Sequence, residues 1–239
     1  MAQEKSATQQ AILAAAQAEF WEKGFQRAAL RSIVKAAGVT TGALYGYYGS
    51  KEALFEALVG RQYKYIMSRY RKAQENFTRI PPAKQPDHMG DISAQCMMDL
   101  LLYAYDHLKA CQLLLCRAEG TRFAHMVDEM VAIEVQGAHE YLQVLSQLGR
   151  SAPAIDPKLE HILITGMFNA YFELVLHKMP LEQAKAYLNE LHVFYAAGWM
   201  KIMGQCPHNF SRISSFPLTI TSYVLPSHSP HIFDSHFHS

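Results

Sequence analysis

The stretch AALRSIVKAAGVTTGALYGYYGSKEALFEALV (28–59) contains the pattern that decides the fold of this chain. Its first part predicts two short helices, at about 29–37 and 40–47, because apolar residues recur there at helical spacing. Gly38 lies between them, and a steep crossing of two short helices needs a turn residue that tolerates positive φ. The stretch therefore predicts a helix-turn-helix over about residues 28–48.

The residues around this turn fit the prediction. Ile33, Val39 and Leu44 are the apolar side chains that would hold the two helices together. Thr40 is a good N-cap for the second helix, and Ser50 begins another helix in the same way. A helix capped by Thr40 leaves the side chains of its first turn facing outward.

The chain continues at helical period from this stretch to about residue 204, and no part alternates as strands do. In the other direction, a helix that begins at Ser6 or Thr8 is expected to end at Gly24. The sequence therefore predicts an all-α fold. Further helices are expected at about 50–75, 92–117, 122–148, 158–178 and 181–203.

Two segments lack helical period. The segment NFTRIPPAKQPDHMGD (76–91) contains three prolines and is expected to be a loop or domain boundary. From Gln205 onward the chain is rich in proline, serine and histidine, and we expect it to be disordered apart from a short extended stretch at LTITSYVL (218–225). The predicted divisions of the chain are 1–50, 51–75, 92–204 and 205–239.

The net charge of +1 conceals a polarity along the chain. Residues 1–75 contain 11 Lys and Arg against 6 Asp and Glu, whereas residues 76–239 contain 11 against 15. A basic N-terminal part beside an acidic remainder suggests that the former meets a polyanion.

Cysteine usage and the N-terminus indicate the compartment. No C-x-x-C pair occurs, so we expect buried thiols in a reducing environment rather than disulfides or a zinc site. The polar start MAQEKSATQQ does not resemble a signal peptide, and no apolar run approaches the roughly 18 residues that span a bilayer. We therefore expect a cytoplasmic protein. The cysteines are Cys96, Cys111, Cys116 and Cys206.

The pattern A-G-V-[ST]-x-G-x-L-Y-x-Y-[FY]-x-[ST]-K-E-x-L occurs here in unbroken spacing from Ala37 to Leu54. With the flanking helices, over about residues 8–60, this region resembles the N-terminal domain of the TetR family of bacterial transcriptional regulators. The resemblance implies a three-helix helix-turn-helix domain, followed by a helical ligand-binding and dimerisation domain. It also implies a double-stranded DNA operator and a small-molecule effector as partners.

The resemblance further implies which residues contact DNA. Thr41 and Ala43 would meet base edges, and Lys51 would hold a phosphate at a helix N-terminus. Two features depart from the family pattern: Thr41 replaces a common basic residue, and Gly46 offers no side chain to read a base. Leu44 and Tyr48 fit a core position better than a contact. The expected DNA-binding residues are Arg27, Arg31, Thr40, Thr41, Ala43, Tyr45, Gly46, Tyr47 and Lys51.

By the same resemblance the last two helices form a four-helix bundle across a homodimer, and the effector binds inside the helical domain. Methionine and aromatic residues at helical spacing are candidates for its lining, although such stripes equally fit an ordinary core. The expected ligand-binding residues are Met98, Leu101, Tyr105, Cys116, Glu119, Met130, Glu134, Phe168 and Phe172. Further candidates are Met97, Leu108, Phe123, Met126, Ile133, Gln95, His107 and Asn169.

Other classes of function have less support in the sequence. An enzyme is not expected, because no nucleophile elbow, phosphate loop or metal-ligand spacing is present, and no cofactor is implied. A metal-binding role would depend on tail histidines that lack a helical ligand motif. The expected function is a ligand-released repressor, with a transcriptional activator of the same fold as the alternative. The tail histidines are His208, His228, His231, His236 and His238.

Overall fold

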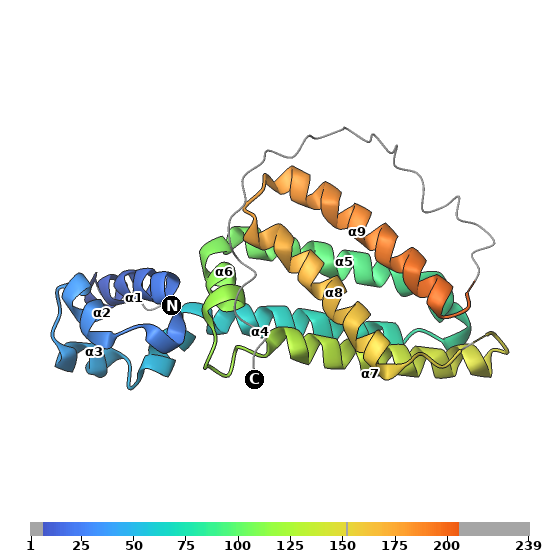
Figure 1. Ribbon diagram of the computed structural model, residues 1–239, viewed down its shortest axis with the longest axis horizontal. Coiled ribbons are helices and arrows are strands. Elements are labelled where there is room, and N and C mark those ends of the chain that lie inside the picture. The colour runs from blue at the N-terminus through green and yellow to red at the C-terminus, as the bar shows by residue number, and fades with distance from the viewer. Residues whose placement is uncertain (1–6, 152, 206–239) are drawn as a thin grey trace. The chain divides into compact units, whose positions relative to one another are not determined.

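The computed structural model describes residues 7–151 and 153–205, and all regular structure in these residues is helical, as expected (Figure 1). Cys206, the five tail histidines and the stretch LTITSYVL lie outside the described residues. The elements are α1 (Ala7–Arg27), α2 (Leu30–Ala37), α3 (Thr41–Tyr47), α4 (Lys51–Thr78), η1 (Pro82–Lys84), α5 (Gln85–Asp106), α6 (Leu108–Arg117), α7 (Met126–Gln147), α8 (Pro157–Leu176) and α9 (Leu181–Ile202).

We call α1–α3 the head and α4–α9 the body. The head forms the predicted helix-turn-helix. Gly38 ends α2 with φ 66° and ψ 30°, and its N–H donates to the carbonyl of Lys35 at 3.3 Å. Thr40 caps α3 by accepting a hydrogen bond from the Ala43 N–H at 3.1 Å. The predicted turn residue and N-cap are both confirmed.

The core of the head consists of side chains from all three of its helices and from the start of α4. Ile12, Phe20, Ile33 and Leu44 are fully buried, and Phe55 from α4 completes the cluster. The rings of Phe20 and Phe55 meet edge to face, with centroids 5.1 Å apart. This packing holds the three helices of the head together and against the start of α4.

Three expectations about helix ends are corrected or refined. The segment 76–91 is mostly helical rather than a loop, because Pro82 and Pro86 lie in the first turns of helical segments, where no backbone N–H is needed. The helix expected at 92–117 is two helices, broken at His107 (φ −128°, ψ 34°). Gly24 does interrupt α1, with φ 72° and ψ 165°, and a final turn follows it.

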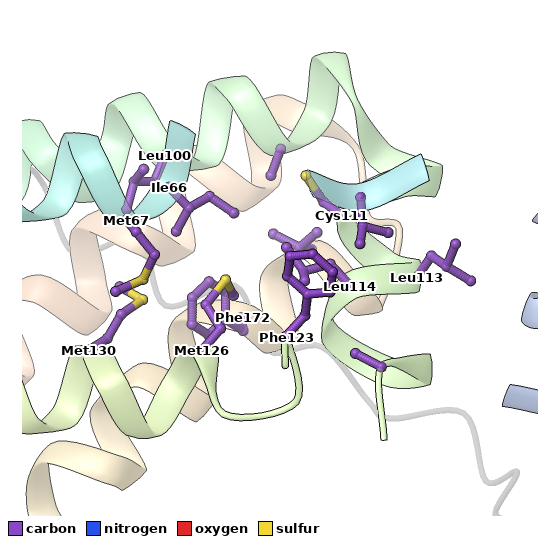
Figure 2. Close-up of a cluster of buried hydrophobic side chains, with 14 of the residues drawn as sticks. Ile66, Met67, Leu100, Cys111, Leu113, Leu114, Phe123, Met126, Met130 and Phe172 are labelled. Carbon is purple, nitrogen blue, oxygen red and sulfur yellow. The ribbon is translucent and has the colours of Figure 1, made fainter. Parts of the chain in front are cut away.

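In the body, α4 packs against α5, α6 and α7, while α8 packs against α7 and α9 (Figure 1). Apolar side chains from α4, α5, α6, α7 and α8 meet in one buried cluster (Figure 2). Cys96 and Cys111 are buried thiols, as expected, whereas Cys116 is exposed.

Helix α8 contradicts the expectation that no segment is apolar enough to span a membrane. Its length of 20 residues and a mean hydropathy of 1.2 suffice by length and composition alone. The expectation was wrong because Glu160 and Glu173 interrupt the apolar run without lowering its mean hydropathy enough. In this structure 44% of the most apolar window is buried inside the protein.

Candidate DNA-binding face and effector cavity

The outward face of α3 contains most of the residues expected to contact DNA. Tyr45 and Tyr47 are 50% and 43% exposed, and Thr41 is exposed beside them. Leu44 and Tyr48 are buried, which confirms their expected place in the core. Gly46 is exposed, and a methyl group added to it would meet no atom within 4 Å. The face therefore has two large phenols and a gap between them.

Lys51 has a structural role that its sequence position did not indicate. Its ammonium group donates to the carbonyls of Gln26 at 3.1 Å and Ala28 at 3.2 Å, and lies 4.6 Å from the centre of the Phe25 ring. These carbonyls are at the end of α1, so Lys51 joins that end to the start of α4. One of the three ammonium donors is left for a phosphate.

Arg27 and Arg31 are exposed at the junction of α1 and α2. The Arg27 Nε donates to the Lys23 carbonyl at 3.3 Å. The assignment of these arginines and of the α3 residues to DNA contact stays a prediction.

Glu19 is a residue of the head that the sequence analysis missed. Its carboxylate accepts the N–H of Ala29, the residue before α2, at 3.0 Å, and the ammonium of Lys23 at 3.1 Å. Burial alone would raise the pKa of Glu19, but these hydrogen bonds and the charge of Lys23 together hold it below its usual value. An acidic residue one turn before a helix end is common, so spacing alone could not identify this contact.

A cavity of about 120 Å³ lies in the body, between α4, α5, α7, α8 and α9. This volume suffices for several water molecules or for one small organic ligand. Its walls are mostly aromatic and thioether side chains, with a few polar groups. The lining includes Tyr70, Gln74, Phe77, Met89, Ser93, Cys96, Met97, Glu134, Tyr141, Met167, Tyr171, His192, Tyr195 and Trp199.

Of the nine residues expected to bind a ligand, only Glu134 lines this cavity; Met97, a further candidate, lines it too. Leu101 and Phe172 line a second cavity of about 20 Å³. Met130 and Phe168 are fully buried in the core, while Cys116 and Glu119 are exposed.

The last two of the nine expected residues pack near the core without reaching the cavity. Tyr105 donates its hydroxyl to the carbonyls of Leu174 and Met179, at 3.1 and 2.9 Å, and Met98 is half-buried. The sequence showed which side chains are apolar. Which of them border an opening depends on how the helices cross.

Glu134 is the centre of a polar cluster at the cavity wall. Its Oε2 accepts hydrogen bonds from the Tyr70 hydroxyl and from the Gln74 amide, the latter at 2.7 Å. Burial raises the pKa of Glu134, and the two hydrogen bonds oppose this only in part. Gly137 makes room for the Gln74 amide, because a methyl group there would lie 2.9 Å from the Gln74 Oε1.

Contacts between head and body connect the two candidate sites. The Arg117 Nε, at the end of α6, donates to the Trp21 carbonyl of α1 at 2.9 Å. Arg122, just after α6, pairs with Glu56 of α4 at 2.5 Å. Phe123 extends the aromatic cluster of the head, with its ring centre 6.2 Å from that of Phe55.

Helices α8 and α9 expose an apolar surface. Ile162 and Phe194 are 64% and 69% exposed, the most of any large apolar side chains among the described residues. Leu159, Tyr187 and Val193 are also exposed on these helices. Large apolar side chains gathered in this way usually mark a surface that another protein covers.

Comparison with known proteins agrees with the geometry of the head. Residues 12–58 match the sequence profile of the family described as bacterial regulatory proteins, tetR family. The regulator UidR of Escherichia coli is 35% identical over 75 residues, which are 31% of this chain and 38% of UidR. The repressor BepR of Brucella suis is 40% identical over 58 residues, 24% of this chain and 28% of BepR. The chain thus spans about two fifths or less of the length of these curated relatives.

The solved structures that match the chain include two transcriptional regulators. FadR from Bacillus subtilis, in complex with stearoyl-CoA, has a TM-score of 0.48 and 16% identity, covering 79% of this chain and 98% of FadR. PfmR from Thermus thermophilus has a TM-score of 0.47 and 17% identity, covering 75% of this chain and 96% of PfmR. The profile match and the sequence relatives thus show that residues 12–58 are similar to the N-terminal domain of the tetR family of bacterial regulatory proteins.

Proposed function

We propose that this protein is a transcriptional regulator that binds a pseudo-palindromic DNA operator as a homodimer and responds to a small, largely apolar ligand. The observation that carries the proposal is the helix-turn-helix, in which Thr40 caps α3 and the outer face of α3 is exposed. In this motif the second helix enters the major groove. UidR and BepR, which match the head, are named as regulators and not as enzymes. Such a protein acts in the cytoplasm, where its operator is.

The proposed DNA contacts divide into two kinds. Thr41 and Ala43, in the first turn of α3, approach base edges, while Thr40 and Tyr47 offer hydroxyl groups to phosphates. Few side chains are available for base readout, since Gly46 has none. We therefore expect the shape of the operator to contribute much of the specificity.

A homodimer supplies the second head that a two-fold operator requires. The exposed apolar residues of α8 and α9, with Ile162 and Phe194 the most exposed, support this assignment. Two copies that pack these helices together would bury the surface that a single chain leaves in water.

The ligand would act by selecting one arrangement of the dimer. In the free dimer both heads fit the groove and transcription is blocked; with ligand in the cavity, α4 pivots and the spacing of the heads no longer matches. The contact from Arg117 to the Trp21 carbonyl is a physical link along which this change can reach the head. An activator of the same fold is the alternative, and a reporter gene distinguishes the two by the sign of the response.

A gel-shift titration with the DNA that flanks the gene of this protein tests the proposal. We expect two protomers to be retained on that DNA and not on a scrambled duplex of equal length and composition. Arg31→Glu should abolish retention, whereas Arg150→Glu, an equal charge change at an exposed arginine of the body, should not. Equal retention of both duplexes at every salt concentration would contradict a specific operator.

A further inference from the structure

Glu134 is a carboxylate in an otherwise largely apolar cavity, and no described residue forms an ion pair with it. Tyr70 and Gln74 are neutral donors, and both use Oε2. Oε1 accepts no hydrogen bond from the described residues and is not enclosed by protein atoms. One oxygen of the carboxylate is therefore left for whatever occupies the cavity.

The cationic side chains near the cavity do not compensate this charge. Arg69 is already paired with Asp99, its Nη2 lying 2.5 Å from the carboxylate and its Nε 3.0 Å. His192 lines the cavity, but burial lowers its pKa and so favours the neutral ring, an effect that Asp91 opposes only in part. A carboxylate that lines a largely apolar cavity without an ionic partner is poorly stabilised, and a bound cation would balance its charge.

The rest of the wall suits an apolar cation. Phe77 and Tyr141 meet edge to face at one part of the wall, with ring centres 5.7 Å apart, and Tyr171 and Tyr195 do so at 5.9 Å in another. Trp199 lines the same cavity. Aromatic faces attract cations, most of all cations that have given up their water.

We propose that the cavity binds a small lipophilic cation, such as an aromatic quaternary ammonium compound, whose positive charge faces Glu134. The inference rests on the proposed function, because it names the class of effector for that site. An anionic ligand would meet the Glu134 carboxylate with no cation to balance it. A neutral apolar ligand would fill the volume and leave the carboxylate without a counter-charge.

Two probes of equal shape test this. Phenyltrimethylammonium and tert-butylbenzene differ only in a quaternary nitrogen in place of a carbon. Binding is measured by tryptophan fluorescence in full-length Trp21→Phe protein, which keeps Trp199 as its one tryptophan. We expect the cation to bind at least about tenfold more tightly than the neutral probe.

Glu134→Gln keeps the shape of the side chain and should remove this preference, while leaving the affinity for tert-butylbenzene unchanged or higher. Glu140→Gln is the matched control, because it removes an exposed charge from the same helix, and it should retain the preference. If Glu134→Gln does not fold, as judged by circular dichroism, the comparison of the two probes on the parent protein still decides.

Equal affinities for the two probes, no binding of either, or a preference that survives Glu134→Gln would each overturn the inference. The gel shift without any ligand separates this result from the proposed function. Specific DNA retention by a protein that fails to prefer the cation would refute the effector class and leave the regulator intact. A Glu134-dependent preference in a protein that retains no DNA would support the cation site and refute the regulator.

Discussion

Two carboxylates, Glu19 in the head and Glu134 in the body, each accept hydrogen bonds from two groups, yet their pKa values shift in opposite directions. The Ala29 N–H, and after it the Lys23 ammonium, stabilise the Glu19 carboxylate by more than burial penalises it, so the pKa of Glu19 falls. Both donors to Glu134 are neutral, so burial dominates and its pKa rises. The head compensates its carboxylate from within the chain, and the body does not.

This difference in charge balance follows from the position of each candidate site, which lies on the surface of the head and in the interior of the body. The head presents a surface, and a surface site needs a rigid scaffold whose own polar groups are satisfied, as Thr40 and Glu19 satisfy the starts of α3 and α2. The body encloses a cavity, where a polar group without a counter-charge is available to a ligand.

The largest effect is expected from breaking the aromatic core that connects head and body. Phe55 is fully buried and lies 5.1 Å from Phe20 and 6.2 Å from Phe123, measured between ring centres. Phe55→Ala should lower the free energy of unfolding by about 3–5 kcal/mol in denaturant titrations, because it leaves a cavity. Tyr45→Ala, at a half-exposed ring of the head, should change it by only about 0.5 kcal/mol. A loss as small for Phe55 as for Tyr45 would show that this core does not join the two regions.

Lys51→Ala is expected to have the next largest effect, on both stability and DNA binding. Losing charge-assisted hydrogen bonds to the Gln26 and Ala28 carbonyls should cost about 1–3 kcal/mol of unfolding free energy. Affinity should fall on all DNA sequences, and the slope of log affinity against log salt should flatten by about one. Lys35→Ala, at an exposed lysine of α2, is the control for charge alone. If Lys51→Ala lowers stability but leaves the salt slope unchanged, Lys51 has a structural role and does not contact a phosphate.

Most of the head could be predicted from the sequence because its signals are local. Gly38, Thr40 and Ser50 each act on a backbone group within a few residues, so their spacing specifies the geometry. Lys51 shows the limit of prediction from local spacing. Its position was identified, but its contact with the Gln26 carbonyl, 25 residues away, was not.

The helices of the body could be predicted from the sequence, but the residues that line its cavity could not. The prolines of 76–91 predict a loop, but Pro82 and Pro86 lie in the first turns of helical segments. The cavity wall joins Glu134 to Tyr70, 64 residues earlier, and to His192 on the last helix. Apolar periodicity gives the buried face of each helix, but the opening between helices depends on their crossing angles, which no local spacing contains.

The uncompensated charge in the body predicts a dependence of stability on pH that is opposite in sign to that expected of Glu19 in the head. A carboxyl group whose pKa rises on folding stabilises the fold most below its unfolded value, near 4.5, and this stabilisation is lost as the pH rises through the folded pKa. Glu134→Gln should therefore raise the melting temperature at neutral pH and leave it unchanged in acid. The ionisable groups facing Glu134 are Tyr70, Cys96 and Tyr171, with His192 across the cavity.

Glu19→Gln is the matched variant in the head and should behave in the opposite way. Because the pKa of Glu19 is lowered on folding, its stabilisation is present at neutral pH and lost as the pH falls through the folded value. We therefore expect this variant to lower the melting temperature at neutral pH. The same sign for both variants would contradict the comparison between the two regions.

The smallest effect concerns the gap on the outer face of α3. Gly46 is helical and exposed, with open space around it, so Gly46→Ala should raise the free energy of unfolding by about 0.5–1 kcal/mol through helix propensity alone. Gly38→Ala should lower it by about 1–2 kcal/mol, because Gly38 has φ 66° and alanine is strained there. If Gly46→Ala stabilises the fold but weakens operator binding in the gel shift, the glycine is retained for a close approach of DNA to α3. If stability and operator affinity are both unchanged or improved, DNA binding does not require a glycine at position 46. Base readout then depends on Thr41, Ala43 and the tyrosines.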